Sequence, residues 1–189
     1  ATIQEDAFYN YAKLSYEIGN IYTSVPEVIS GYLEKYPQTY YRIQLEELLI
    51  DSYISSKNYR AAYDLLLKNP KFENRESLQI VRYYLGIEAL NNGNLTEASR
   101  YLEEALSENV NAHYHAKATY WNAEVDYRLG KYDVAYLGFQ RFKQQPGYQQ
   151  LDENKNLDYN IGYTLFKNKN YKDAIGYFDA FLKQTGNSP

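Results

Sequence analysis

The sequence predicts an all-α fold, an α-solenoid of about five helix–turn–helix repeats, because one outline returns along the chain. The outline occupies "IDSYISSKNYRAAYDLL" from Ile50, "GIEALNNGNLTEASRYL" from Gly86, "AEVDYRLGKYDVAYLGF" from Ala123 and "GYTLFKNKNYKDAIGYF" from Gly162. Apolar residues recur in it at intervals of three and four, which places them on one face of a helix. Repeats of this kind bury their apolar faces against their neighbours, so we expect them to stack.

Small residues mark the same places in these repeats. The second helix carries Ala62, Ala98, Ala135 and Ala174, which lie 36, 37 and 39 residues apart. Twelve residues before these alanines, the first helix carries Ile50, Gly86, Ala123 and Gly162, and four residues after them come Leu66, Leu102, Phe139 and Phe178. We expect the two helices of a pair to meet at the small residues, because a large side chain there pushes the backbones apart.

The first repeat is the most divergent. Residues 8–20 predict its first helix, with Ala12 at the small position, and residues 24–37 predict its second helix. Ser24 and Glu27 have the spacing of a capping box, and Pro26 suits the first turn of a helix. One extra residue separates these two helices, so the register slips by one.

Turn and cap residues separate the helices of the later repeats. The tight turns are predicted at Gly93, Gly130 and the pair Lys57–Asn58. Helix N-caps are predicted at Asn58, Asn94 and Asn170, and Pro37, Pro70 and Pro146 are predicted to end second helices. The sequence therefore predicts ten helices in a single domain over residues 1–189, with repeats at about 5–38, 39–73, 74–110, 111–148 and 149–186.

Polar residues stand where the pattern calls for apolar ones. They are Glu46, Arg82, Thr119 and Asp158, together with Asn122 and Asp126 in the fourth repeat. Either the first helix of that repeat is rotated, with Ala118, Trp121 and Val125 facing inward, or a polar contact is buried there. We favour rotation, because an unpaired buried carboxylate is costly.

The combination of small residues, turn, aromatic, alanine and closing proline resembles the tetratricopeptide repeat over nearly the whole chain. The resemblance implies a right-handed α-solenoid whose first helices line a concave surface and whose second helices form the convex back. The spacing here exceeds the usual 34 residues of that repeat. Arrays rich in Tyr and Asn with long repeats resemble tetratricopeptide proteins of the bacterial cell envelope, which implies a periplasmic or envelope-associated setting, and otherwise a cytoplasmic one.

The same resemblance implies a binding groove lined by aromatic rings. Tyrosine stands three residues before the small residue in four of the five repeats, at Tyr9, Tyr83, Tyr120 and Tyr159. Further candidates near that face are Tyr84, Trp121, Tyr127 and Tyr163, and Lys117 and Arg128 add charge. Tyrosine and tryptophan are frequent anchors at interfaces. The alternative is that these rings only pack neighbouring first helices together.

Composition excludes several other functions. The net charge is -4 and the pI is about 5.3, which leaves no positive footprint for nucleic acid. Cysteine is absent. On a helix, the two histidines, His113 and His115, point about 200° apart and cannot share a metal, whereas in an extended loop they could. We expect no catalytic residue, no metal site and no cofactor. The apolar runs are too short for membrane insertion.

Two functions remain. The first is a non-catalytic module that binds a peptide or protein segment in the concave groove. The second is an assembly scaffold whose repeats stack on further repeats or on sister chains. The last second helix carries much apolar surface, including Tyr171, Ile175, Phe178 and Leu182, and "KQTGNSP" opens a loop after it. We therefore expect that the array continues beyond residue 189, or that another molecule covers this face, for example by self-association.

Overall fold

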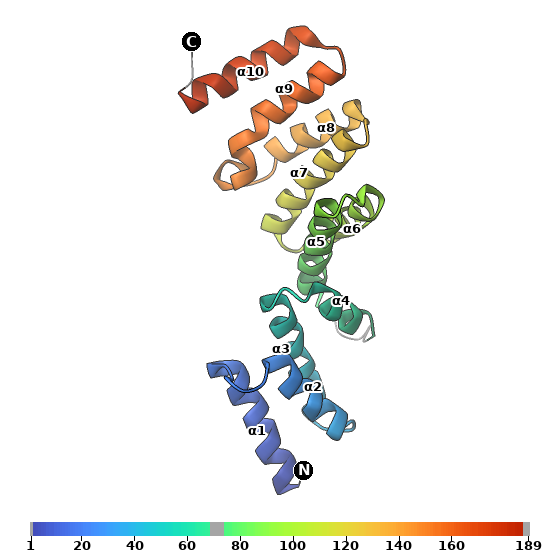
Figure 1. Ribbon diagram of the computed structural model, residues 1–189, viewed down its shortest axis with the longest axis vertical. Helices are drawn as coiled ribbons and strands as arrows, with labels where there is room; N and C mark the ends of the chain where they lie inside the picture. The colour runs from blue at the N-terminus through green and yellow to red at the C-terminus, as the bar shows by residue number, and fades with distance from the viewer. Residues whose placement is uncertain (1, 69–73, 187–189) are drawn as a thin grey trace. The chain divides into compact units, whose positions relative to one another are not determined.

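The structure is a computed structural model that describes residues 2–68 and 74–186, and these residues form ten α-helices with no strand (Figure 1). The chain divides into two compact units, Ala1–Ser77 and Leu78–Pro189. The predicted all-helical class and the five helix pairs are confirmed. Pro70 and Asn187–Ser188–Pro189 lie outside the described residues.

Unit 1 is built from the first two helix pairs. Its helices are α1 (Ile3–Ile18), α2 (Val25–Lys35), α3 (Arg42–Ser55) and α4 (Tyr59–Lys68). The core between α1, α2 and α3 contains Ala12, Ile29, Tyr32 and Leu45, all fully buried. The capping box is confirmed, because the Glu27 amide donates to the Ser24 hydroxyl and the Ser24 amide donates to the Glu27 carboxylate.

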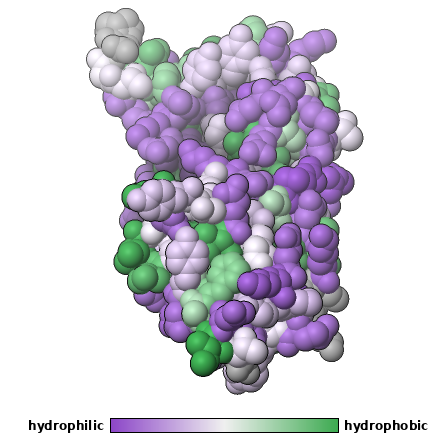
Figure 2. All heavy atoms as spheres, turned by 60° about the horizontal axis from the view of Figure 1, so that its bottom comes forward, coloured by the Kyte–Doolittle hydropathy of each residue, from purple (hydrophilic) through white to green (hydrophobic). Residues whose placement is uncertain are grey.

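One face of α1 is left uncovered by the rest of unit 1. Tyr11, Leu14 and Ile18 are 46%, 50% and 74% exposed. Figure 2, in which the bottom of Figure 1 comes forward, shows hydrophobic side chains gathered at the surface of this part of the molecule. The spacing of these residues, three and then four, places them in one stripe along the helix.

Unit 2 holds the remaining three helix pairs. Its helices are α5 (Arg75–Asn91, whose first three residues fall in unit 1), α6 (Leu95–Ser107), α7 (Ala112–Arg128), α8 (Tyr132–Lys143), α9 (Leu157–Lys167) and α10 (Tyr171–Thr185). Two short 3-10 helices, Tyr148–Gln150 and Asp152–Asn156, fill the connection between α8 and α9. Within the described part of this unit, α7 packs on α6 and α8, and α9 packs on α8 and α10.

The small residues do sit where the paired helices come closest. A Cβ added at Gly86 stands 2.7 Å from Cγ of Leu102, and one added at Gly162 stands 2.8 Å from Cε1 of Phe178. The fourth repeat exchanges the roles, since a Cβ on Gly138 of α8 stands 2.7 Å from the Cβ of Ala123. The paired helices therefore approach closely in all three repeats, and the glycine that allows it lies on the first helix in two of them and on the second helix in the other.

The turns between paired helices adopt left-handed backbone conformations. Gly93 and Gly130 each have a φ of 77°, and Lys57 and Lys169 take the same place with φ of 60° and 63°. The three asparagines predicted as N-caps accept hydrogen bonds from the backbone amides of Ala61, Glu97 and Asp173. These predictions from local sequence are confirmed.

Rotation of α7 explains only in part how this helix accommodates polar residues at positions where apolar ones are expected. Ala118 and Val125 are fully buried, as the rotation predicts, and Trp121 is half-buried. Asp126 nevertheless remains inside, with 8% of its surface exposed, and its carboxylate lies 3.4 Å from the Lys131 ammonium. The preference for rotation alone is therefore wrong, because a paired carboxylate is also buried there.

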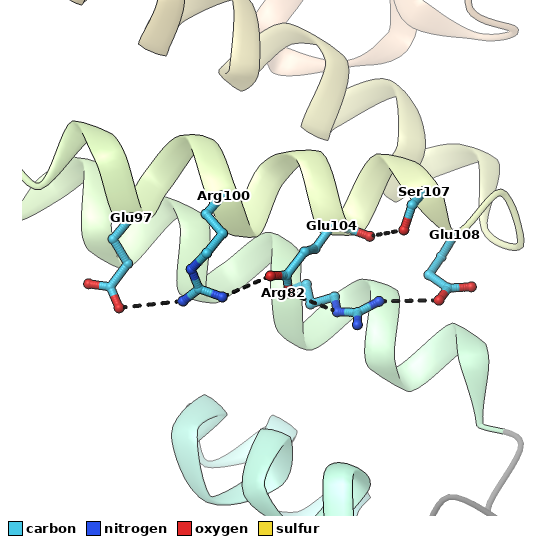
Figure 3. A network of polar contacts seen from close by, with 6 residues as sticks. All are labelled: Arg82, Glu97, Arg100, Glu104, Ser107 and Glu108. Carbon is cyan, nitrogen blue, oxygen red and sulfur yellow. Dashed lines mark hydrogen bonds and ion pairs between the residues drawn. The ribbon is translucent and has the colours of Figure 1, made fainter.

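A second polar residue at an apolar position, Arg82, joins α5 to α6 (Figure 3). Its guanidinium lies 3.3 Å from a Glu104 oxygen and 3.2 Å from a Glu108 oxygen. Arg100 reaches the other oxygen of Glu104 at 2.8 Å. The Arg82 side chain is only 15% exposed. Its ion pairs with Glu104 and Glu108 therefore join α5 and α6 at a position where the repeat pattern calls for an apolar side chain.

Candidate functional site

Two adjoining hollows lie between α7 and α9 in unit 2. The smaller, of about 240 Å³, is lined by Glu124, Tyr127, Tyr159, Asn160 and Tyr163. The larger, of about 480 Å³, is lined by Tyr120, Trp121, Glu124, Arg128, Asn156, Tyr159, Asn160 and Phe181. Because they share Glu124, Tyr159 and Asn160, they form one depression, which we call the α7–α9 groove.

Helix geometry brings these side chains together. On α7, Tyr120, Glu124 and Tyr127 follow one another at intervals of four and three, so they lie on one face. On α9, Tyr159 and Tyr163 are four residues apart and form a parallel row. The two rows face each other, since the Tyr127 and Tyr163 rings lie 6.4 Å apart between centroids.

The aromatic side chains give the groove an apolar and accessible surface. The rings of Tyr159 and Tyr163 lie 5.6 Å apart and are tilted by 33°. Tyr159 is 43% exposed and Tyr163 is 37% exposed, and the Tyr159 ring also lies 5.5 Å from Phe181 of α10. Half-exposed, closely spaced rings of this kind bury a large apolar area when a partner covers them.

Polar groups are placed between the rings. The Asn160 amide donates a hydrogen bond to the Tyr120 hydroxyl, and the Arg128 guanidinium donates to the Glu124 carboxylate at 2.8 Å. Burial raises the pKa of the Tyr120 hydroxyl, and burial also raises the pKa of Tyr127. Both hydroxyls therefore stay neutral around pH 7. The groove offers rings, neutral hydroxyls, an amide and one ion pair.

Six of the ten predicted site residues line this groove. They are Tyr120, Trp121, Tyr127, Arg128, Tyr159 and Tyr163. Tyr83 and Tyr84 instead pack against Tyr114 at the junction of α5 and α7, with ring centroids 5.4 and 5.8 Å from it. Lys117 pairs with Glu153 at 3.3 Å, and that carboxylate also accepts a hydrogen bond from the Trp121 indole. Tyr9 belongs to unit 1, where its ring stacks on Tyr41 at 3.9 Å.

Two predicted ring anchors are buried. Tyr83 and Tyr120 are each 5% exposed. Tyr83 packs in the core cluster of α5, α6 and α7, and Tyr120 packs in that of α7, α8 and α9. Their rings hold neighbouring helices together, so the packing alternative describes them better than the anchor interpretation does. Tyr120 also lines the larger hollow of the groove.

The sequence interpretation missed Glu124 and Asn160, which line both hollows. A signal for Glu124 existed, because it lies four residues after Tyr120 and three residues before Tyr127 and so shares their helix face. The search favoured aromatic residues and passed over it. Asn160 carried no comparable signal, since its importance depends on the hydroxyl of Tyr120 one repeat earlier.

A larger and more polar cavity of about 650 Å³ lies between α6 and α8, with α7 as its floor. The floor residues His115, Thr119, Asn122 and Asp126 are spaced by four, three and four along α7. In the described chain, the buried His115 Nδ1 and Asn122 Oδ1 have no hydrogen-bond partner. This cavity explains why polar residues stand on α7, but its lining includes no Tyr, Trp or Phe side chain.

In the part of the chain that the structure describes, no group of three or more His, Asp or Glu side chains is placed to hold a metal ion. No helix among residues 2–68 and 74–186 is both long and apolar enough to cross a membrane.

Comparisons with known proteins agree with the repeat architecture. A family model described as "Tetratricopeptide repeat" matches residues 83–149. No curated protein matches the sequence significantly. The chain is similar to the solved structure of YrrB, described as "a TPR protein with an unusual peptide-binding site", with a TM-score of 0.62 and 19% identity over 98% of this chain and 89% of that one.

Two further structures have the same fold. The MamA protein aligns with a TM-score of 0.59 and 15% identity, covering 95% of this chain and 91% of the other. A structure of nearly identical TPR-like repeats from Podosopora anserina aligns with a TM-score of 0.51 and 14% identity, covering 98% of this chain and 97% of the other. At these identities the likeness establishes the fold alone. Residues 83–149 thus match the tetratricopeptide-repeat model, and the chain has the fold of tetratricopeptide-repeat proteins.

Proposed function

We propose that the α7–α9 groove is a non-catalytic binding site for a peptide segment of a partner protein. The observation that carries the proposal is the pairing of exposed rings, Tyr159 and Tyr163, with a hydrogen-bonding amide, Asn160, in one groove. Aromatic rings supply the apolar anchor and the amide pairs with a peptide backbone, since it has both a donor and an acceptor. The peptide-binding description of YrrB supports the same use of this fold.

Selection from a random peptide library tests this proposal without a known partner. Peptides selected on the full chain are expected to bind the Tyr163→Ala and Asn160→Ala variants at least about tenfold more weakly, because an interface anchor contributes about 2 kcal/mol. The control is Leu137→Ala, which removes an exposed side chain on α8 outside both hollows of the groove. Equal binding by all variants would contradict the groove as the site.

The exposed apolar face of α10 favours a second function, that of an assembly scaffold. We propose that the protein self-associates through the outer face of this helix. Ile175, Tyr171 and Leu182 are 61%, 53% and 36% exposed there. A contiguous apolar surface of this kind marks an interaction site in a protein that stays in solution.

The tyrosine- and asparagine-rich composition also motivates a proposal on location. We propose a periplasmic or cell-envelope setting, which rests on the resemblance to envelope repeat proteins. Fractionation of cells that carry the tagged full-length protein tests it, and recovery with the cytoplasmic markers would contradict it.

A further inference from the structure

The uncovered face of α10 has counterparts inside unit 2 whose neighbours are known. Each residue of the α10 face has a counterpart on α8, 39 residues earlier in the sequence. The α10 residues are Tyr171, Ile175, Phe178, Phe181 and Leu182, and their α8 counterparts are, in the same order, Tyr132, Tyr136, Phe139, Phe142 and Lys143. On α8 these positions are buried or half-buried, and α9 packs against the helix. On α10 three of the five are exposed. The outer face of α10 therefore has the chemistry of a surface that receives the first helix of a following repeat.

The uncovered face of α1 is the matching surface. Ala7, Tyr11 and Leu14 of α1 occupy the places of Leu157, Ile161 and Thr164 in α9, counted from the small residue of each first helix. The three α9 residues are at most 1% exposed, and Leu157 and Ile161 pack in one cluster with Phe139 and Phe142 of α8. The three α1 residues are exposed. A first helix such as α9 packs this face against the second helix of the preceding repeat. In α1 the same face is exposed.

Charge at the helix ends agrees with this match. In the α8–α9 contact, Lys143 in the last turn of α8 pairs with Asp158 in the first turn of α9 at 3.1 Å. α10 carries Lys183 in its last turn, and α1 carries Glu5 and Asp6 in its first turn. When two helices pack antiparallel, these ends meet, and opposite charges favour the contact.

From these correspondences we propose that α10 of one molecule receives α1 of a second copy, in a head-to-tail contact that repeats the α8–α9 interface. The inference rests on the self-association proposed above and names the surface of the partner copy. The proposed contact is heterologous, because two different faces meet. Such contacts extend into open filaments or close into rings. The α7–α9 groove shares Phe181 with the α10 face, whereas its Tyr127 and Asn160 are not among the residues of that face.

Complementation between two variants tests the contact. Leu14→Glu places a charge on the α1 face, and Ile175→Glu places one on the α10 face. Both positions are exposed, so the fold is expected to survive, and circular dichroism checks this. Ala180→Glu is the matched control, since Ala180 is exposed elsewhere on α10. Sedimentation velocity over a range of protein concentrations gives the readout.

The assemblies formed by the wild type and by Ala180→Glu are expected to increase in size with protein concentration. Leu14→Glu and Ile175→Glu are each expected to stay monomeric. An equimolar mixture of Leu14→Glu and Ile175→Glu is expected to form dimers that do not grow, because only one intact interface remains. A monomeric wild type would overturn self-association itself. Loss of association in Ile175→Glu alone, with Leu14→Glu unaffected, would indicate pairing of α10 with α10 and overturn the head-to-tail contact.

Discussion

Tyr120 and Tyr159 hold the same position in successive repeats, yet Tyr120 is 5% exposed and Tyr159 is 43% exposed. The difference follows from their neighbours. α9 packs over the Tyr120 ring in the core cluster that includes Leu157 and Ile161, whereas no described helix of unit 2 covers Tyr159 on its outer side. One residue type at one position therefore serves as core in one repeat and as accessible surface in the next.

Alanine substitutions at these two positions should separate the two roles. Tyr120→Ala is expected to lower the free energy of unfolding by about 3–5 kcal/mol, because it leaves a cavity among Phe139 and Phe142. Tyr159→Ala should cost much less, about 1 kcal/mol, because the ring is already half in water. Urea unfolding of both variants measures the difference, and equal losses would contradict the assignment of roles.

The close approach of paired helices predicts opposite effects for two glycine substitutions. Gly162→Ala should destabilise by about 1–3 kcal/mol, because the new Cβ stands 2.8 Å from the Phe178 ring. Gly176→Ala, on exposed α10, meets nothing within 4 Å and should stabilise by about 0.5–1 kcal/mol. Thermal unfolding of the pair tests this. A stabilised Gly162→Ala variant would show that the helices are not in tight contact there.

The Arg82 ion pairs should contribute more than an exposed pair does. Arg82→Met removes contacts to Glu104 and Glu108 from a side chain that is 15% exposed, so we expect a loss of about 1–3 kcal/mol. Arg100→Met is the control, because the Arg100 side chain is 49% exposed and its pairs lie within one helix, which are typically worth below about 1 kcal/mol. Chemical denaturation in low salt measures both, and a larger loss in the control would contradict the account.

Alkaline pH should destabilise the protein through its buried tyrosines. Burial raises the pKa of Tyr83 and of Tyr120 above the ordinary value of 10.0, so the folded state keeps both protons where the unfolded state loses them. Stability is therefore fully present below about pH 10 and falls as the pH rises further, by up to about 1.4 kcal/mol per unit for each residue. Melting temperatures between pH 8 and 11 measure this trend. The Tyr83→Phe variant should lose less stability over that range, and identical curves would contradict the assignment.

Local sequence signals predicted the local structure well. The capping box at Ser24 and the N-cap at Asn94 depend on residues a few positions apart, and both form as expected. The repeat spacing also gave the correct helix pairs, since small residues recur in register. Burial of Tyr83 was not predictable in this way, because the packing of a neighbouring repeat determines it. Asn160 was missed for the same reason, since its partner Tyr120 belongs to the preceding repeat. The buried Asp126–Lys131 pair, five residues apart, corresponds to the alternative that the sequence analysis did not favour.

The most direct test of the binding groove is an NMR titration of the isotopically labelled full chain with a library-selected peptide. Groove binding predicts that the amide signals of Glu124, Tyr127, Asn160 and Tyr163 shift first and saturate together, while those of α8 residues such as Leu137 stay in place. Shifts that cluster instead on His115, Thr119 and Asn122, in the polar cavity between α6 and α8, would contradict the assignment of the α7–α9 groove as the binding site.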